Sequence, residues 1–317
     1  MPIGGVAIGH WTDADAGTGC TVVIPPPGTV GAIDVRGGGA STREAALLDP
    51  VSNVPGPTAL LLTGGSAVGL DAAAGVTRWC RERGVGHDVS VATVPIVVSA
   101  VIFDLGITGG ARVPGPDDAY AACAAARDAP PAQGCVGAGT GATVGKFFGR
   151  EGWCKGGLGW AEATTYDGAR VGALVVVNAF GDVLDERGDV LAGAWRDGIG
   201  FVRTSEWSLR RPPSHPRIAP THTTLACVVT DAALTPVEAT HVARAASAGV
   251  CRCVAPVNTA LDGDVSFALA TGARPAAAIG CALAAATATE RAVRNAVRHA
   301  VTLRGVPTAT MRRAGAD

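Results

Sequence analysis

The stretch of this chain that most constrains its fold is a short apolar, β-branched run from Thr223 to Thr230, which follows a proline-rich segment. Four prolines and no hydrophobic periodicity between residues 210 and 220 predict an irregular, exposed approach. The run itself predicts a buried strand that begins at or just after Thr223. A linker that enters a strand at a threonine is expected of a self-processing N-terminal nucleophile, and it is equally typical of an ordinary loop.

Length and charge narrow the class of protein. With 317 residues, 48% of them apolar and 17% charged, the chain can bury a large core as one α/β or α+β domain or two tightly packed ones. A formal charge of −1 provides no basic field for nucleic acid or an anionic membrane. Without a leader-like N-terminus or an uninterrupted run of eighteen apolar residues, we expect a cytoplasmic protein that binds neither nucleic acid nor membrane.

The cysteine and histidine spacings favour neither a disulfide framework nor a metal site. Nine cysteines are an odd number, they include no CxxC pair, and the six histidines show no HxH or HExxH spacing. We therefore expect reduced, mostly buried thiols and no metal. The cysteines stand at positions 20, 80, 123, 135, 154, 227, 251, 253 and 281.

Hydrophobic patterning predicts alternating strands and helices. Apolar runs predict buried strands near residues 20–24, 29–35, 59–63, 94–104 and 171–182. Helices are predicted from 67 to 83, from 116 to about 127, from 236 to 247 or 248, and from about 275 to 302. In the third helix Thr235 is the expected N-cap, with Pro236 at the first position and Glu238 closing a capping box. Arg291, Arg294 and Arg298 are expected on a solvated basic face of the last helix.

Two glycine-rich segments predict loops whose backbone comes close to another chain or to a ligand. Gly64-Gly65-Ser66 follows a strand, and Ser66 stands where a helix N-cap belongs; a GxSxG elbow would need Gly at Val68. The second loop contains Gly137, Gly139 and Thr140 and delivers Lys146, but it fits neither phosphate-loop template.

Three other polar residues lie at the ends of apolar runs. Asn178 ends a run that should be buried, so its amide is either a turn former or a donor to a developing oxyanion. Asp262-Gly263-Asp264 is first of all a tight turn, and its paired carboxylates could also orient a hydroxyl and an amine near a nucleophile.

Taken in order, these motifs resemble peptidase family S58, which contains L-aminopeptidase/D-esterases, β-aminopeptidases and 6-aminohexanoate-oligomer (nylon) hydrolases. The resemblance runs from about Val6 to Thr271, and each motif alone is weak while the ordered set is specific. The motifs are Val35 to Gly38, Leu62 to Asp71, Val136 to Ala142, Lys155 to Gly159, Val177-Asn178, Thr223 to Leu225 and Asp262 to Asp264.

The resemblance implies an α+β fold, an αββα sandwich of the N-terminal-nucleophile-like type that forms a single large domain over residues 1–317. It implies a precursor that cuts itself between His222 and Thr223 into chains 1–222 and 223–317. The hydroxyl of Thr223 would attack the preceding carbonyl, and the ester so formed would be hydrolysed to release an α-amine. The same hydroxyl would then form an acyl-enzyme with an amide or ester substrate. No cofactor is implied.

The other site roles are carried over from the same resemblance. Asn178 matches an oxyanion-binding or nucleophile-positioning Asn, and Asp262 and Asp264 match two positions that bracket the nucleophile. Lys146 matches a lysine of the nylon-oligomer branch, so the site is similar to a Thr, Lys, Asp, Asp version. His222 departs from the usual Asn or Gly, and its ring would either slow self-cleavage or assist it as a local base.

The expected partner is a small-molecule amide or peptide substrate, and the resemblance implies a homo-oligomer such as a homotetramer. Pocket walls are expected from residues 64–66 and 137–140 and from neighbouring subunits. Two rival classes stay open at this point: an acyltransferase similar to ornithine acetyltransferase, which would use the same Thr chemistry, and a non-enzymatic, glycine-rich ligand-binding protein.

Overall fold

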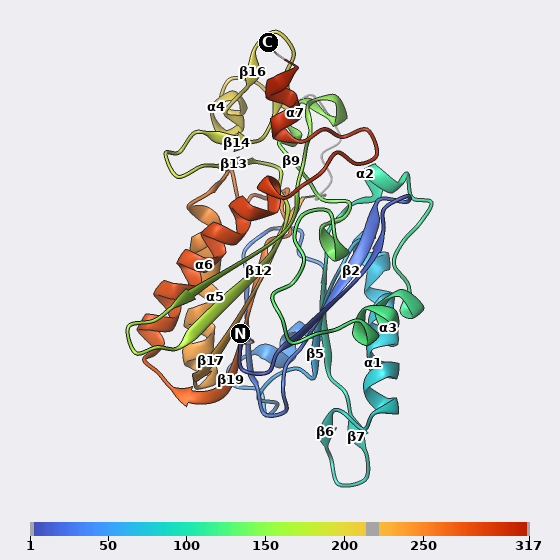
Figure 1. Cartoon of the computed structure of the whole chain (residues 1–317), viewed down its shortest axis with the longest axis vertical. Helices are drawn as coiled ribbons and strands as arrows, with labels where there is room; N and C mark the ends of the chain where they lie inside the picture. The colour runs from blue at the N-terminus through green and yellow to red at the C-terminus, as the bar shows by residue number, and fades with distance from the viewer. Residues whose placement is uncertain (1–2, 214–221, 316–317) are drawn as a thin grey trace.

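The computed structural model describes residues 3–213 and 222–315, which form two five-stranded sheets packed face to face between two layers of helices (Figure 1). The first sheet has the order β1 (Ala7–Asp13), β2 (Thr18–Ile24), β5 (Ala59–Thr63), β8 (Val97–Val101), β4 (Thr42–Arg43). The second has the order β11 (Gly157–Thr164), β12 (Arg170–Asn178), β17 (Thr223–Ala233), β19 (Val265–Pro275), β3 (Val30–Val35). In each sheet one pair is parallel, β5 with β8 and β17 with β19, and the other pairs are antiparallel.

Helices cover the outer faces of both sheets. Helices α1 (Ala73–Glu82) and α3 (Pro116–Ala124) pack on the first sheet, and α5 (Pro236–Cys251) and α6 (Ala278–Arg298) pack on the second. This arrangement is an αββα sandwich, which confirms the predicted fold class.

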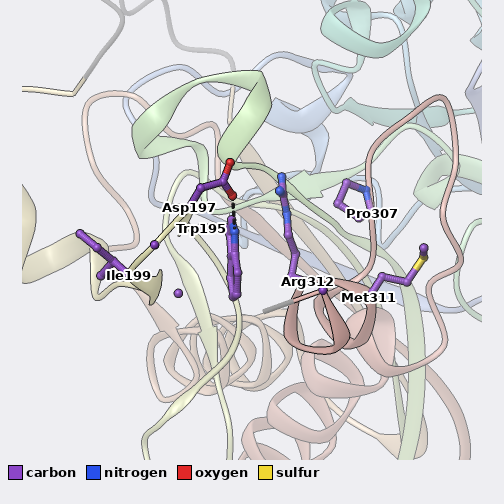
Figure 2. Close-up of a pocket in the computed structure, with 9 residues that line it drawn as sticks. Trp195, Asp197, Ile199, Pro307, Met311 and Arg312 are labelled. Carbon is purple, nitrogen blue, oxygen red and sulfur yellow. Dashed lines mark hydrogen bonds between the residues drawn. The ribbon is translucent and has the colours of Figure 1, made fainter. Parts of the chain in front are cut away.

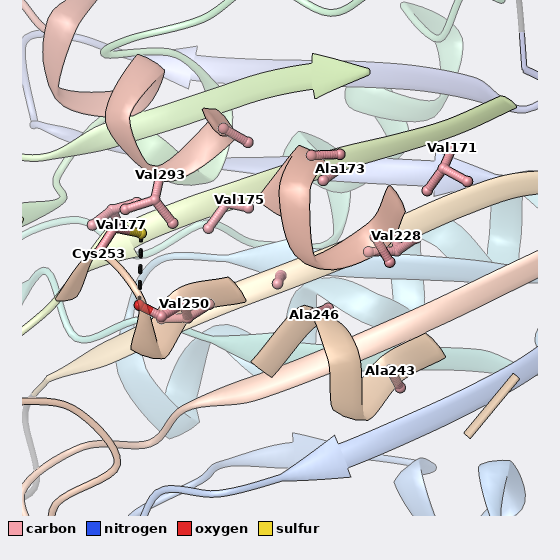
Figure 3. Close-up of a cluster of buried hydrophobic side chains, with 14 of the residues drawn as sticks. Val171, Ala173, Val175, Val177, Val228, Ala243, Ala246, Val250, Cys253 and Val293 are labelled. Atoms are coloured by element: carbon pink, nitrogen blue, oxygen red, sulfur yellow. Dashed lines mark hydrogen bonds between the residues drawn. The ribbon is translucent and has the colours of Figure 1, made fainter. Parts of the chain in front are cut away.

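The alternation of side chains along β17 explains why the strand is buried on both faces. Leu225, Cys227 and Val229 point into the core between the two sheets, whereas Ala226 and Val228 belong to the core beneath α5 and α6. Figure 3 shows this second core, where valines of β12 and β17 meet small side chains of the two helices. A strand apolar on both faces reads as a continuous hydrophobic run, which is the pattern seen from Leu225 to Val229.

Short elements surround the sandwich. The strands are β6 (His87–Asp88), β7 (Thr93–Val94), β9 (Thr143–Val144), β10 (Cys154–Lys155), β13 (Asp182–Leu184), β14 (Val190–Ala192), β15 (Trp195–Arg196), β16 (Gly200–Phe201) and β18 (Val254–Ala255). The helices are α2 (Leu105–Thr108), α4 (Thr204–Ser208) and α7 (Ala309–Ala314), with 3-10 turns η1 (Ala45–Leu48), η2 (Ser66–Ala72), η3 (Gly137–Gly139), η4 (Lys146–Phe148) and η5 (Arg150–Gly152). Among the described residues, no helix combines the length and hydropathy needed to cross a membrane.

Several local predictions are confirmed. The strand at 223 begins at Thr223, and α5 begins with Thr235 as N-cap, Pro236 at the first position and Glu238 closing a capping box. All nine cysteines are free thiols, and seven of them are buried.

Three local predictions are wrong. Ser66 caps no helix, because Gly65 holds the N-cap position and Ser66 itself has a left-handed φ of 54°. The last helix, predicted from about 275 to 302, is shorter at both ends and runs from Ala278 to Arg298, since β19 continues to Pro275. Arg294 is buried and donates to the carbonyls of Leu184 and Asp185, so it does not share the solvated face of Arg291.

The close approach of β11 to α6 predicts a strong effect of substitution at Gly159. A Cβ atom there would lie 1.9 Å from the carbonyl oxygen of Ala292, in the middle of α6. We expect Gly159→Ala to destabilise the protein by at least about 2 kcal/mol and to lower the midpoint of thermal unfolding by several degrees. Gly315→Ala is the matched control, because its Cβ would meet nothing closer than 3.6 Å. Equal midpoints for the two variants would contradict this packing.

Candidate active site

The ends of three neighbouring strands bring the predicted site residues together. In the antiparallel pairing of β12 with β17, Asn178 at the end of one strand lies opposite Thr223 at the start of the other. The parallel neighbour β19 begins at Val265, so the preceding turn with Asp262 and Asp264 lies at the same edge of the sheet. Asn178, Thr223, Asp262 and Asp264, which are up to 86 positions apart in the sequence, therefore meet because of sheet topology.

The Thr223 side chain is buried and is engaged with the carbonyl group that precedes it. Its Oγ1 donates a hydrogen bond of 2.6 Å to the carbonyl oxygen of His222. The amide N–H of Gly263 donates to the same oxygen at 2.6 Å. The peptide bond between His222 and Thr223 thus has the hydroxyl beside its carbonyl group and a backbone donor on its oxygen, where a donor would stabilise negative charge.

The absence of a side chain at Gly263 also allows its close approach to the Thr223 hydroxyl. A Cβ atom at this position would lie 2.9 Å from Thr223 Oγ1 and 2.9 Å from the carbonyl oxygen of Gly39. A glycine lets the turn approach both groups. The sequence analysis gave no role to this residue, because a backbone amide has no signature in the side-chain pattern.

Lys146 and Asn178 form a buried pair. Gly145, with a left-handed φ of 69°, turns the chain into η4, and Lys146 Nζ then donates to Asn178 Oδ1 at 2.8 Å and to the Asn178 carbonyl oxygen at 3.1 Å. The Thr143 amide donates to the same Oδ1 at 3.1 Å, and Asn178 Nδ2 donates to the carbonyl oxygen of Phe103 at 3.1 Å. These bonds fix the Asn178 side chain and hold Lys146 through it.

The two aspartates hold the backbone around Thr223. Asp264 accepts from the amides of Thr224 at 2.5 Å and Asn258 at 3.0 Å. Asp262 accepts from the amide and hydroxyl of Thr259 at 3.0 and 2.6 Å. Asp264 therefore fixes the backbone at Thr224. Asp262 closes the turn that carries the Gly263 amide.

Burial changes the proton affinity of this cluster. Loss of hydration lowers the pKa of the Lys146 ammonium to about 7, and the Asp262 carboxylate opposes that shift. Burial raises the pKa of Asp264 above its ordinary value, and the nearby charge of Asp262 raises it further. A lysine with a pKa near neutrality can accept a proton at the pH of a cell.

Two further buried charges support the site, and the sequence analysis gave them no role. Lys155 Nζ donates to the carbonyl oxygens of Thr140 at 2.9 Å and Ala142 at 2.6 Å, and burial lowers its pKa. Asp104 accepts from the Thr18 hydroxyl at 2.6 Å and the Gly65 amide at 2.8 Å, and burial raises its pKa. In the sequence, the position of Asp104 at the end of an apolar run was the feature that could have indicated a buried carboxylate.

The predicted pocket residues lie in the same region but mostly pack against the protein itself. The Gly65 amide is bonded to Asp104, and the Thr140 hydroxyl donates to the Gly137 carbonyl at 2.7 Å. Added Cβ atoms at Gly64 and Gly139 would lie 2.1 Å from Asp104 Oδ2 and 2.2 Å from the Leu158 amide nitrogen. A pocket role for these residues and for Ser66 stays a prediction.

A small cavity of about 30 Å³ adjoins this cluster of predicted site residues. It is lined by two predicted site residues, Lys146 and His222, together with Phe103, Asp104, Gly106, Ile107, Thr143 and Trp153. The volume is enough for one or two water molecules. None of the predicted glycine-loop residues lines it.

A wider, open cavity of about 600 Å³ lies between the β15–β16 hairpin and α7 (Figure 2). Its wall includes Arg312 and the Trp195 indole, whose Nε1–H donates a hydrogen bond of 2.8 Å to the Asp197 carboxylate. None of the predicted site residues lines it, so its size does not make it the candidate active site. Within the described parts of the chain, no three potential ligands of a metal ion gather at one place.

Comparison with known proteins gives relatives along most of the chain. Uncharacterized aminopeptidases of Mycobacterium tuberculosis and Mycobacterium bovis are 44% identical over 294 residues, which cover 86% of this chain and 80% of theirs. A 6-aminohexanoate-oligomer endohydrolase of Paenarthrobacter ureafaciens is 30% identical over 273 residues, which cover 84% of this chain and 73% of that protein.

Solved structures have the same fold. A Burkholderia sp. β-aminopeptidase superposes with a TM-score of 0.71 at 25% identity, over 99% of this chain and 91% of that one. An L-aminopeptidase D-Ala-esterase/amidase of Ochrobactrum anthropi, described as a variant of the Ntn hydrolase fold, gives 0.72 at 21% identity, over 99% and 92%. The model of Peptidase family S58 matches residues 2–311. On this match and these relatives, the chain belongs to peptidase family S58.

Proposed function

We propose that this member of a family of peptide and amide hydrolases is a self-processing amidohydrolase or aminopeptidase whose nucleophile is Thr223. The observation that carries the proposal is the convergence of the Thr223 hydroxyl and the Gly263 amide on the carbonyl oxygen of His222. A hydroxyl and an oxyanion donor at one peptide bond make that bond the first substrate of the site.

Self-cleavage would proceed by an N-to-O acyl shift. Thr223 Oγ1 bonds to the carbonyl carbon of His222 while the hydroxyl proton passes to a base, and the developing oxyanion is held by the Gly263 amide. The bond from that carbon to the Thr223 nitrogen then breaks, and the nitrogen takes up a proton. Water hydrolyses the resulting ester, which leaves a carboxylate on His222 and a free α-amine and hydroxyl on Thr223.

Before cleavage the chain has no α-amine at Thr223, and Lys146 is the candidate base. Two of its Nζ hydrogens bond to Asn178, so the third position is a proton in the ammonium and a lone pair in the amine. Its lowered pKa makes the amine form accessible near pH 7. Asn178 would then position this base, while Gly263 supplies the oxyanion donor.

After cleavage the same hydroxyl would turn over substrates. The new α-amine, with an ordinary pKa of about 7.7 to 8.0, would then take over from Lys146 as the base for the Thr223 hydroxyl. Attack on an amide or ester gives an acyl-enzyme, which water hydrolyses. The names of the relatives support small peptides, amino-acid amides or ω-amino-acid oligomers as substrates.

Removing the hydroxyl should stop both reactions. We expect Thr223→Ala to stay a single 31.5 kDa chain without hydrolase activity, whereas the unaltered protein yields a fragment that begins at Thr223. Intact mass spectrometry measures this directly. Thr230→Ala, on the same strand, is the control and should cleave normally. A Thr223→Ala protein that still matured and hydrolysed amides would refute the assignment of the nucleophile.

Crowding the nucleophile should slow self-cleavage without unfolding the protein. An added Cβ in Gly263→Ala would lie 2.9 Å from Thr223 Oγ1 and would displace it from the carbonyl group. We expect the rate of cleavage to fall about 10²-fold, as measured by the decay of the full-length band with time. Gly115→Ala, whose Cβ would meet nothing closer than 3.8 Å, should cleave at the normal rate. Unchanged kinetics in Gly263→Ala would argue against the proposed geometry.

The lowered pKa of Lys146 predicts how self-cleavage depends on pH. Because the base must be unprotonated, the rate should rise about tenfold per pH unit below about 7 and level off above it. Lys146→Arg, which stays charged, should cleave slowly and lose this inflection. Asp264→Asn should keep the inflection, since the titrating group is the lysine. Rates that are independent of pH between 5 and 8 would exclude Lys146 as the base.

A further inference from the structure

The His222 side chain occupies an enclosed space beside the nucleophile. Its ring is buried, with 8% of the residue exposed, and lies against the Phe180 ring with centroids 5.2 Å apart and planes 33° apart. His222 also lines the small cavity, whose other walls include the apolar side chains of Phe103, Ile107 and Trp153. The protein thus surrounds one planar ring at the residue whose carbonyl group faces Thr223.

The position of this ring bears on substrate choice, because self-cleavage and turnover share one nucleophile. In self-cleavage His222 is the acyl group: its carbonyl oxygen accepts from Thr223 Oγ1 and from the Gly263 amide. A substrate that forms an acyl-enzyme must present its own carbonyl group to the same hydroxyl and the same donor. The side chain next to that carbonyl group then falls where the His222 ring lies.

We propose that, once His222 has left, its enclosure is the subsite for the acyl residue of the substrate, and that it selects aminoacyl amides with a planar ring, such as histidyl and phenylalanyl amides. This inference rests on the function proposed above. Phe180 supplies the face on which the ring stacks, and the neighbouring cavity adds room for a larger ring.

The same enclosure is a poorer fit for acyl residues that are charged, small or unbranched. A cationic lysyl or arginyl side chain would lose its hydration in this enclosure, and the cavity wall offers it no excess of negative charge because Asp104 stands there together with Lys146. A small side chain such as that of alanine would leave the Phe180 ring without its contact. An unbranched 6-aminohexanoyl chain could enter but would not stack.

The first experiment compares p-nitroanilides on the matured protein. L-Histidyl and L-phenylalanyl p-nitroanilides are expected to have a kcat/KM about tenfold or more above that of the L-alanyl, L-lysyl and 6-aminohexanoyl compounds. Intact mass spectrometry of the same sample records whether the chain has been cut after His222.

The second experiment removes the stacking surface. Phe180→Leu keeps apolar volume but loses the ring, so KM for the histidyl and phenylalanyl compounds should rise about two- to tenfold with kcat unchanged. The ratio of kcat/KM for the ring-bearing compounds to that for the alanyl compound should fall by about the same factor, because alanine has no ring to stack on Phe180. Phe201→Leu is the matched control: Phe201 packs edge to face on Trp195 at 5.0 Å, outside the site, and its loss should change neither group of substrates.

The outcomes separate the two proposals. A protein cut at Thr223 that hydrolyses alanyl or 6-aminohexanoyl compounds as fast as the ring-bearing ones would keep the proposed function and overturn the subsite. An equal loss on all substrates in Phe180→Leu would also overturn it, because Phe180 would then have only a structural role. A chain that neither cleaves nor hydrolyses any amide would overturn the proposed function and the subsite with it.

Discussion

The pairing of β12 with β17 is the constraint on which the rest of the site depends. It sets Asn178 opposite Thr223, and through the parallel contact of β17 with β19 it places the Asp262–Asp264 turn beside both. A shift of one residue would turn Leu225 and Val229 from the core between the sheets to the helix side. The two cores packed on opposite faces of β17 therefore fix the register of this strand. The register in turn fixes the positions of the residues around Thr223.

The second constraint is the cost of burying charge at the end of an apolar sandwich. Lys146, Lys155, Asp104, Asp262 and Asp264 are all buried, and each is bonded to backbone groups, hydroxyls or an amide. Such bonds offset part of the lost hydration, and the remainder appears as the lowered pKa values of Lys146 and Lys155 and the raised pKa values of Asp104 and Asp264. The lowered pKa of Lys146 is thus a consequence of the fold, and it is the property that the proposed self-cleavage asks of its base.

The sequence pattern correctly predicted those structural elements that depend only on residues close to one another in the sequence. The capping box at Thr235 and the strand that begins at Thr223 depend on neighbouring residues, and both are confirmed. Ser66 and Arg294 were misjudged because tertiary contacts decide their conformation and burial. The candidate site came from the ordered set of motifs, since residues as distant as Lys146 and Asp264 share no local signal. The Gly263 amide could not be predicted at all, because any residue except proline carries one.

Backbone groups lie close around Thr223, because several of the neighbouring residues are glycines. The amide of Gly39 donates to the Asp262 carbonyl at 2.9 Å, while Gly37 approaches so closely that a Cβ would lie 2.3 Å from that oxygen. Gly263, held in this way from the far side, reaches the His222 carbonyl with its own N–H. Donors built from the backbone would not change in the proposed cleavage of the peptide bond after His222. Under that proposal, the environment that surrounds His222 in the intact chain is also the environment that a later substrate would meet.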